Sequence, residues 1–224
     1  MYSERPSMLP HVVAWRSVTP PGGPVKRILP DGCLDVIWHD GRVFVAGPDT
    51  TAQLSRPAAG SRFFALRFGA GTGPGVLGLP ADELTDRQVP LDAFWPAAEV
   101  RRLAEAADPA PALEAAARRH WHDPDRAMVD LAAQARAGRP VGSIAGRLGL
   151  SARHLQRRCN AAFGYGPKTL ARVFRLERAV RLARGGVPFA AVSAEAGYAD
   201  QAPLAREVRA MAGVSLGELL TRAS

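Results

Sequence analysis

Arginine supplies most of the charged chemistry in this chain. Of the 29 basic residues, only Lys26 and Lys168 are lysines. The guanidinium group is planar and always charged, and its fork of donors matches phosphate oxygens and the edge of guanine better than an ammonium group does. The composition therefore suggests a polyanionic partner, although an arginine bias of the genome gives the same composition.

The charge is unevenly distributed along the sequence. The whole chain of 224 residues has a formal net charge of +8 with neutral histidines. Residues 139–224 contain 14 basic and 5 acidic residues, a net of +9, which leaves a net of −1 for residues 1–138. The C-terminal part is therefore the one expected to face a polyanion such as nucleic acid.

A second group of reactive side chains surrounds Cys33. Asp31, Asp35 and His39 lie close to it in sequence, which suggests a thiol sensor or a partial metal site. In a strand, Cys33 and Asp35 share one face with Ile37 and His39. One cysteine and one histidine are too few ligands for zinc, so burial of Cys33 is the alternative.

Two further patterns point away from catalysis. On a helix, His120 and His122 diverge by about 200°, which favours a role at the helix end over metal binding. The glycine-rich run 69–75 lacks the Lys-Ser/Thr of a phosphate-binding loop and predicts a flexible turn. Since no set of nucleophile and base stands out, the sequence predicts no catalytic residue, no metal and no cofactor, and we expect the chain not to be an enzyme.

The elements that position these residues divide the chain. Residues 1–95 are rich in Gly, Pro and β-formers, which predicts a β-rich domain. Asp40-Gly41, between two β-forming runs, predicts a two-residue hairpin turn. Residues 62–68 predict a strand whose core face carries Phe64, Leu66 and Phe68.

Helical composition begins at residue 96. Ala, Leu, Arg and Glu dominate residues 96–138, and Asp-Pro breaks divide this segment into expected helices at about 97–107, 112–121 and 125–136. We expect a helical bridge here, which is also a candidate surface for pairing with a second subunit.

Residues 141–162 have the pattern of a helix-turn-helix. Gly149 follows the first helix where a left-handed residue is wanted, Ser151 is a good N-cap for the second, and Leu155 is placed to pack back on Leu150. The inward face of the first helix is formed by Val141, Ile144, Ala145 and Leu148. The outward face of the second helix, polar and positive, is formed by Arg153, Gln156, Arg157 and Asn160.

A second unit with the same pattern follows about fifty residues later. Gly197 ends its first helix and Asp200 caps its second. Its inward residues are expected to be Phe189, Val192, Ser193, Ala196, Leu204 and Val208, and its outward residues Gln201, Ala202, Ala205 and Arg206. The stretch 168–184 has no Gly or Pro and predicts a rigid spacer of roughly 26 Å, suited to placing two helices in successive major grooves about 34 Å apart.

The two units resemble the AraC/XylS family of bacterial transcriptional regulators. The resemblance is carried by Leu148-Gly149-Leu150-Ser151 and Phe163-Gly164-Tyr165-Gly166-Pro167 in the first unit, and by Gly197-Tyr198-x-Asp200-Gln201 and Gly213-Val214-Ser215 in the second. It covers about residues 140–220. Ala202 and Pro203 stand at positions that are commonly polar in the family.

The resemblance implies a base-reading role for Arg153, Gln156 and Arg157 in the first unit. In the second unit it implies the same role for Gln201 and Arg206. Arginine can grip guanine and glutamine can bridge adenine, each worth about 1–3 kcal/mol of discrimination; a solvated helix face is the alternative. The candidates for phosphate contacts are Arg147, Lys168 and Arg209, for which plain surface charge is the alternative.

The N-terminal part resembles the uncharacterised β-rich domain of one subgroup of these regulators. The matching residues are Leu29-Pro30-Asp31-Gly32-Cys33 and Gly78-Leu79-Pro80-Ala81-Asp82. The resemblance implies binding of a small effector or dimerisation. The candidate lining of an effector pocket is Trp15, Cys33, Trp38, Phe44 and Phe64, although aromatic residues of a small β-domain are core by default.

The expected fold is α+β. It has a β-rich N-terminal domain over residues 1–95, a helical bridge over 96–138, and an all-α C-terminal domain over 139–224 with two helix-turn-helix units joined by a linker helix. The expected function is sequence-specific regulation of transcription. The expected partners are promoter DNA, a small effector, a second copy of the chain and, in an activator, RNA polymerase.

Two alternatives stay open at this point. One is an enzyme or effector-binding β-domain fused to DNA-binding helices, and the other is an architectural protein that binds DNA without sequence preference. The start of the chain has no apolar leader and no stretch approaches the ~18 apolar residues of a membrane span, so we expect a cytoplasmic protein with no membrane partner.

Overall fold

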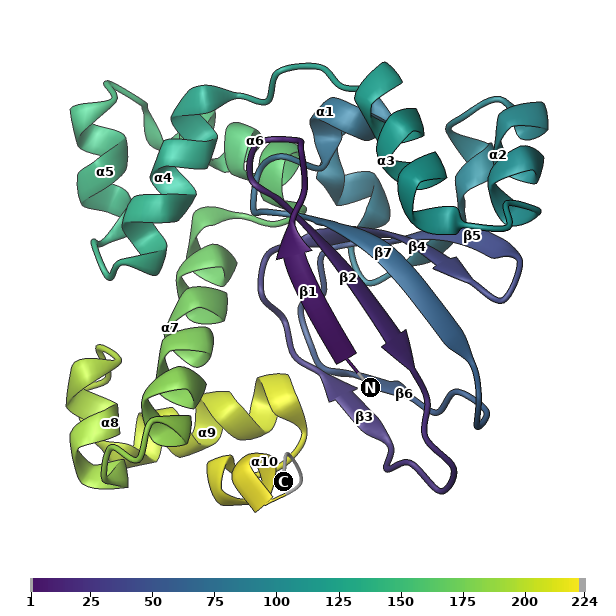
Figure 1. The fold of residues 1–224 in the computed structure, drawn as a ribbon. Helices are drawn as coiled ribbons and strands as arrows, with labels where there is room; N and C mark the ends of the chain where they lie inside the picture. Colours follow the sequence, from purple (N-terminus) through teal and green to yellow (C-terminus); the bar gives the residue numbers. More distant parts are fainter. Residues whose placement is uncertain (1, 222–224) are drawn as a thin grey trace.

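The computed structural model describes residues 2–221, and its N-terminal part is built on one antiparallel sheet (Figure 1). The strand order is β1-β2-β7-β4-β5-β8, so most neighbours in the sheet come from distant parts of the sequence. The strands are β1 (Tyr2–Pro6), β2 (Val12–Val18), β4 (Leu34–His39), β5 (Arg42–Ala46), β7 (Arg62–Phe68) and β8 (Gln88–Pro90).

The predicted hairpin between β4 and β5 is confirmed. His39 pairs with Arg42, and Asp40 and Gly41 have φ angles of 44° and 83°. Positive φ at both central residues is what a type I′ turn requires. The predicted strand 62–68 is confirmed as β7, which lies between β2 and β4 at the middle of the sheet.

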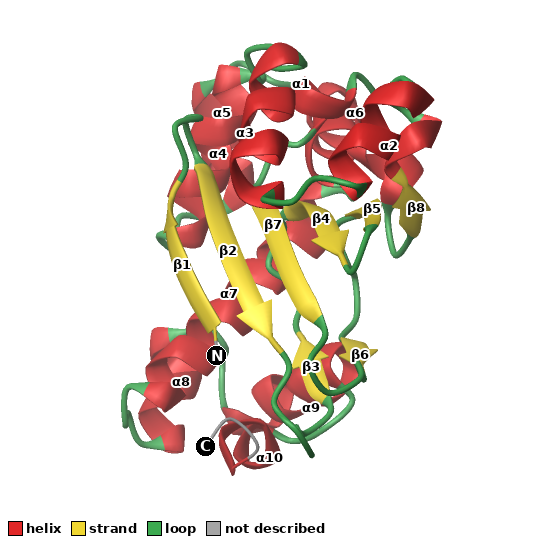
Figure 2. Ribbon diagram, turned by 45° about the vertical axis from the view of Figure 1, so that its right-hand side comes forward, coloured by secondary structure: helices red, strands yellow, loops and turns green. Residues whose placement is uncertain are grey.

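The two faces of the sheet have different environments. Along β4, residues 34, 36 and 38 are buried while 35, 37 and 39 are half-buried, as the period-two alternation of a strand requires. The buried face packs under α2 (Ala97–Ala104) and α3 (Pro109–Arg119), whose apolar residues join it in one core (Figure 2). The other face is left to line a cavity.

A short two-stranded ribbon stands apart from the main sheet. Its strands, β3 (Lys26–Ile28) and β6 (Gln53–Ser55), pair antiparallel. The ribbon lies beside the last helices of the chain (Figure 1), and it therefore connects the N-terminal part to the C-terminal part.

The remaining helices build a second core. α4 (Arg126–Arg136) contributes Met128, Leu131 and Ala132 to the same apolar cluster as the C-terminal helices. These are α5 (Val141–Arg147), α6 (Ala152–Phe163), α7 (Pro167–Arg184), α8 (Phe189–Glu195), α9 (Gln201–Ala212) and α10 (Leu216–Thr221). The three helices expected over residues 96–138 are therefore present, and they divide between the two cores.

Three expectations from the sequence are wrong. Leu148 is 40% exposed because α5 ends at Arg147, and Phe189 is 46% exposed at the first turn of α8. The glycine run is only partly a turn, because Pro74 begins the short helix α1 (Pro74–Leu77). Proline fits there since the first helical turn lacks acceptors for its N–H groups. A side chain at Gly75 would collide with the carbonyl oxygen of His122.

Short connections complete the N-terminal part. Two single-turn 3₁₀ helices, η1 (Ala81–Leu84) and η2 (Leu91–Ala93), flank β8. At the end of α3, the Nε2 atom of His120 lies 3.0 Å from Glu99 Oε2, and its ring stacks on Trp95.

Over residues 2–221, no cluster of His, Cys, Asp and Glu is arranged to hold a metal ion, and no helix is long and apolar enough to span a membrane.

Candidate nucleic-acid interface and effector cavity

The first helix-turn-helix unit consists of α5 and α6. Gly149 adopts a left-handed φ of 65° between them, and the Ser151 hydroxyl accepts a hydrogen bond of 3.3 Å from the backbone N–H of His154. The Ser151 cap satisfies one of the free donors at the start of α6. Leu155 and Cys159 are buried against the second core. The turn glycine and the cap are both where the sequence predicts them.

The opposite face of α6 is open to solvent. Arg153, Gln156 and Arg157 are all exposed on it, and Asn160 beside them accepts a 2.9 Å hydrogen bond from Gln156. Within residues 2–221, neither arginine has a hydrogen-bond or ion-pair partner. Their guanidinium groups are therefore available to a polyanion.

The second unit, α8 and α9, repeats the local geometry. Asp200 accepts a 2.8 Å hydrogen bond from the backbone N–H of Ala202 and so caps α9. Gln201 and Arg206 are exposed, as the sequence predicts. Pro203 lies in the first turn, where its missing N–H is tolerated. We call α6 and α9 the recognition helices.

Glu207 on the inner side of α9 ties the second unit to the linker helix α7. Its carboxylate accepts hydrogen bonds from Arg172 (3.0 Å), Arg175 (3.2 Å) and the hydroxyl of Tyr198 (2.7 Å). The Arg175 guanidinium also lies 5.0 Å from the centre of the Tyr198 ring. The sequence did not reveal Glu207, because its arginine partners stand more than thirty positions earlier.

The three candidates for phosphate contacts are exposed but differ in their surroundings. Arg147 donates a 2.7 Å hydrogen bond to the side chain of Gln134. Lys168 lies in the first turn of α7 and Arg209 in the last turn of α9. The structure thus brings Arg147 to α4, and it leaves the other two side chains at helix ends facing solvent.

The N-terminal part donates a hydrogen bond to a carbonyl group at the C-terminal end of each recognition helix. The hydroxyl of Thr85 donates a 2.7 Å hydrogen bond to the carbonyl of Gly164, which ends α6. Arg27 in β3 donates a 2.6 Å hydrogen bond to the carbonyl of Ala212 at the end of α9. These bonds satisfy carbonyl groups that a helix terminus leaves free.

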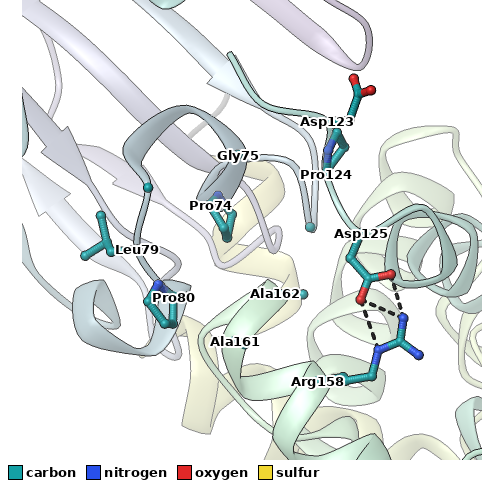
Figure 3. Close-up of a pocket in the computed structure, with 12 residues that line it drawn as sticks. Pro74, Gly75, Leu79, Pro80, Asp123, Pro124, Asp125, Arg158, Ala161 and Ala162 are labelled. Atoms are coloured by element: carbon teal, nitrogen blue, oxygen red, sulfur yellow. Dashed lines mark hydrogen bonds and ion pairs between the residues drawn. The ribbon is translucent and has the colours of Figure 1, made fainter. Parts of the chain in front are cut away.

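A groove of about 370 Å³ lies between the N-terminal part and α6 (Figure 3). Pro74 and Pro80 line one wall, and Ala161 with Ala162 lines the other. Arg158 closes the groove by a bidentate ion pair with Asp125, with a shortest N–O distance of 2.6 Å. Arg158 is therefore engaged within the protein, unlike its neighbour Arg157.

A cavity of about 440 Å³ lies between the uncovered face of the main sheet and the β3–β6 ribbon. Three of the predicted residues, Trp15, Cys33 and Phe44, line it. Trp38 and Phe64 do not, and their prediction is wrong. They point to the opposite face, where both are buried under the helices and the Trp38 indole donates a 3.1 Å hydrogen bond to the carbonyl of Ala104.

Charged side chains in the cavity were missed by a prediction based on aromatic residues. Asp35 accepts a 2.7 Å hydrogen bond from the Trp15 indole and lies 3.3 Å from the guanidinium of Arg67. Burial raises the pKa of Asp35, and the Arg67 charge opposes that rise. The alternation of β4 does place Asp35 and His39 on the side of Cys33, so the signal was present in the sequence.

Cys33 lies at the edge of this cavity as a free thiol. Its backbone N–H donates a 2.9 Å hydrogen bond to Asp31. Burial raises the pKa of the Cys33 thiol well above its ordinary value, and the nearby Asp31 charge adds to the rise. A thiol is reactive as its thiolate, and this environment disfavours that form of Cys33.

Two family models match the chain, one in each part. A helix-turn-helix domain matches residues 144–222, which include both recognition helices and the linker helix. The C-terminal part is an AraC-type helix-turn-helix domain. A domain of unknown function, DUF6597, matches residues 10–90. These matches support a DNA-binding regulator of transcription, with an AraC-type helix-turn-helix domain in its C-terminal part and a DUF6597 domain in its N-terminal part.

Solved structures share the two-domain fold. ToxT from Vibrio cholerae O395, bound to (E)-4-(8-methylnaphthalen-1-yl)but-3-enoic acid, has a TM-score of 0.52 at 10% identity, covering 100% of this chain and 99% of that one. Wild-type ToxT from Vibrio cholerae strain SCE256, bound to an unsaturated fatty acid, has a TM-score of 0.50 at 11% identity, covering 99% and 98%.

A shorter match comes from a second organism. A probable AraC family transcriptional regulator from Rhodopseudomonas palustris CGA009 is 25% identical over 44% of this chain and 98% of its own, with a TM-score of 0.38. No protein of curated function matches the sequence.

Proposed function

We propose that this AraC-type regulator reads a specific promoter sequence and changes its DNA affinity when a small molecule occupies the cavity. In this proposal Arg153, Gln156 and Arg157 contact bases from α6. Gln201 and Arg206 do so from α9. The remaining proposed contacts, to phosphates, come from Arg147, Lys168 and Arg209.

One observation carries the effector proposal: the β3–β6 ribbon lines the cavity and also holds α9. Lys26, Ile28 and Gln53 face the cavity. Arg27, between Lys26 and Ile28, binds the end of α9, and the N–H of Ala52, just before β6, donates a 2.7 Å hydrogen bond to the carbonyl of Met211. A ligand that moves the ribbon must therefore move or release the second recognition helix.

A second wall of the cavity meets the linker helix. The loop before β4 carries Asp31, whose carbonyl accepts a 2.7 Å hydrogen bond from Arg136. The Arg136 guanidinium lies 4.6 Å from the centre of the Phe174 ring in α7, and Gly32 packs against the same ring. Both the ribbon and this loop couple the cavity to the DNA-binding part.

The similar structures support a small-molecule effector by analogy of fold. ToxT is bound to an unsaturated fatty acid in one of them and to a naphthalenyl butenoic acid in another. A second copy of the chain and, for an activator, RNA polymerase stay predictions as further partners.

Selection of duplexes from a random pool tests the DNA-reading proposal. The full chain should enrich one sequence and prefer it over random DNA by roughly 10³-fold or more at fixed salt. Arg157→Ala should weaken that preference. Arg102→Ala is the matched control, since Arg102 is an exposed arginine of α2 outside the helix-turn-helix units.

The same experiment tests the architectural alternative. An architectural protein would show equal affinity for selected and random DNA. Unchanged affinity in Arg157→Ala would refute α6 as the reading helix. An enzyme in the β-rich domain would require turnover that the DNA experiment does not detect, and no constellation of residues described above supplies its chemistry.

A further inference from the structure

The effector cavity contains more carboxylates than cations in its interior. Asp31, Asp35 and Asp49 all line it. Arg67 is the cationic lining residue that is half-buried with them, while the other two, Lys26 and Arg56, are exposed to solvent. The interior therefore carries an excess of negative charge.

Arg67 is already committed to two of these carboxylates. Its Nε atom lies 3.3 Å from Asp35 Oδ1 and 3.9 Å from Asp31 Oδ2. One guanidinium is thus shared through its Nε atom between two acids, so the carboxylates outnumber the half-buried cation that faces them.

Asp49 has no cation of its own within residues 2–221. Its carboxylate accepts a 3.2 Å hydrogen bond from the side-chain amide of Gln53. Burial raises the pKa of Asp49 to about 6, and the charges of Asp86, Asp31 and Asp35 add to the rise. A carboxylate in such surroundings is stabilised by any cation that approaches it.

Part of the cavity wall is aromatic. The rings of Phe63 and His39 stack with centroids 4.1 Å apart, and Trp15 lies 6.5 Å from Phe63 in a stacked arrangement. Phe44 also lines the cavity. Aromatic faces carry a negative quadrupole and attract cations as well as flat apolar groups.

We propose that the cavity binds a cationic organic molecule, a protonated amine or amidine with an apolar or aromatic body, whose charge pairs with Asp49. This inference deepens the proposed function, because it names the chemical class of the effector. An organic acid would meet three carboxylates and a guanidinium that is already paired, so the acids bound by ToxT are the wrong charge for this cavity.

Three probes with one carbon skeleton test the charge preference. Tryptamine, indole-3-propionate and tryptophol differ in carrying an ammonium, a carboxylate or a hydroxyl group. Binding to the full chain is measured by isothermal titration calorimetry at neutral pH. Tryptamine should bind at least about tenfold more tightly than indole-3-propionate, with tryptophol between them.

Asp49→Asn tests the position of the charge. The substitution keeps the size of the side chain and an acceptor for Gln53, so the fold should be retained, which a thermal melt checks. Tryptamine affinity should fall about tenfold, while tryptophol affinity should not change. Asp130→Asn is the matched control, since Asp130 is an exposed aspartate of α4 outside the cavity, and it should leave all three affinities unchanged.

The inference is overturned by equal or tighter binding of the acid, or by an amine affinity that Asp49→Asn does not alter. Absence of binding by the amine also overturns it. Failure of the effector proposal gives a different result, because tryptamine would then bind through Asp49 without changing the affinity for the selected DNA. A change in DNA affinity caused by the acid alone would support an effector and refute the amine class.

Discussion

The two recognition helices end alike but present different side chains. Each is capped at its start by a hydroxyl or carboxylate and is held at its end by a hydrogen bond from the N-terminal part. The exposed side of α6 carries Arg153, Gln156 and Arg157, whereas that of α9 carries Ala202 and Ala205 beside Arg206. We therefore expect base reading to rest mainly on α6.

The units also differ in what fixes them. α9 is joined to the linker helix by the half-buried Glu207 and its two arginine partners. α6 is fixed by apolar packing and by the Arg158–Asp125 ion pair at its side. The comparison indicates that the second unit is set by a polar contact to the linker, while the first is set by the N-terminal part and α4.

Removal of the Glu207 carboxylate should have the largest effect, because it removes the polar contact that joins α9 to the linker helix. Glu207→Ala leaves Arg172 and Arg175 without their acceptor, and we expect a loss of about 2 kcal/mol in the free energy of unfolding, allowing for the partial exposure of both arginines. Urea denaturation measures it. Glu195→Ala, at an exposed position of α8, should change stability by less than about 0.5 kcal/mol. Equal effects of the two variants would show that the cluster does not hold the second unit.

Single arginine variants compare how much each recognition helix contributes to base reading. Arg157→Ala is expected to cost about 2 kcal/mol of affinity for the selected duplex, and Arg206→Ala about 1 kcal/mol or less. Quantitative gel shifts at one salt concentration give both values. A larger loss with Arg206→Ala would reverse the assignment of the dominant reading helix.

Thr85→Val removes the hydroxyl that holds α6 and keeps the side-chain shape. The carbonyl of Gly164 then loses its partner, and we expect a loss of about 1 kcal/mol in unfolding free energy. Faster hydrogen exchange at the end of α6 but not of α9 should accompany it. Thr51→Val, at an exposed threonine, is the control and should leave both helix ends protected.

The smallest expected effect concerns phosphate contacts. Lys168→Ala and Arg209→Ala should each lower the slope of log affinity against log salt by about 1, with the preference among sequences unchanged. Affinities measured at several salt concentrations test this. A change of preferred sequence in either variant would instead mark that residue as a base-reading residue.

The turn residues and helix caps of the helix-turn-helix units were predictable because they depend on neighbours in sequence. Gly149 and Ser151 act within one turn of the residues they serve, and so does Asp40-Gly41 in the hairpin. Phe189 was misplaced because the apolar spacing alone does not show that the first residue of α8 stays 46% exposed.

Contacts between distant segments were not predictable from one sequence. Nothing near Asp49 in the sequence shows that the β3–β6 ribbon closes a cavity over it, and Glu207 gives no local sign of its arginine partners in α7. Trp38 and Phe64 were placed in the cavity by residue type alone. The period of two along β4 and β7 would have assigned both to the covered face.

The linker helix α7 runs without interruption from Pro167 to Arg184. Since each helical residue adds about 1.5 Å of length and 100° of rotation, the number of residues in α7 fixes the angular phase of one recognition helix relative to the other. Inserting one residue would turn the second unit by more than a quarter of a circle. Under the proposed function, the length of this one helix sets the separation and phase of the two DNA segments that the recognition helices contact.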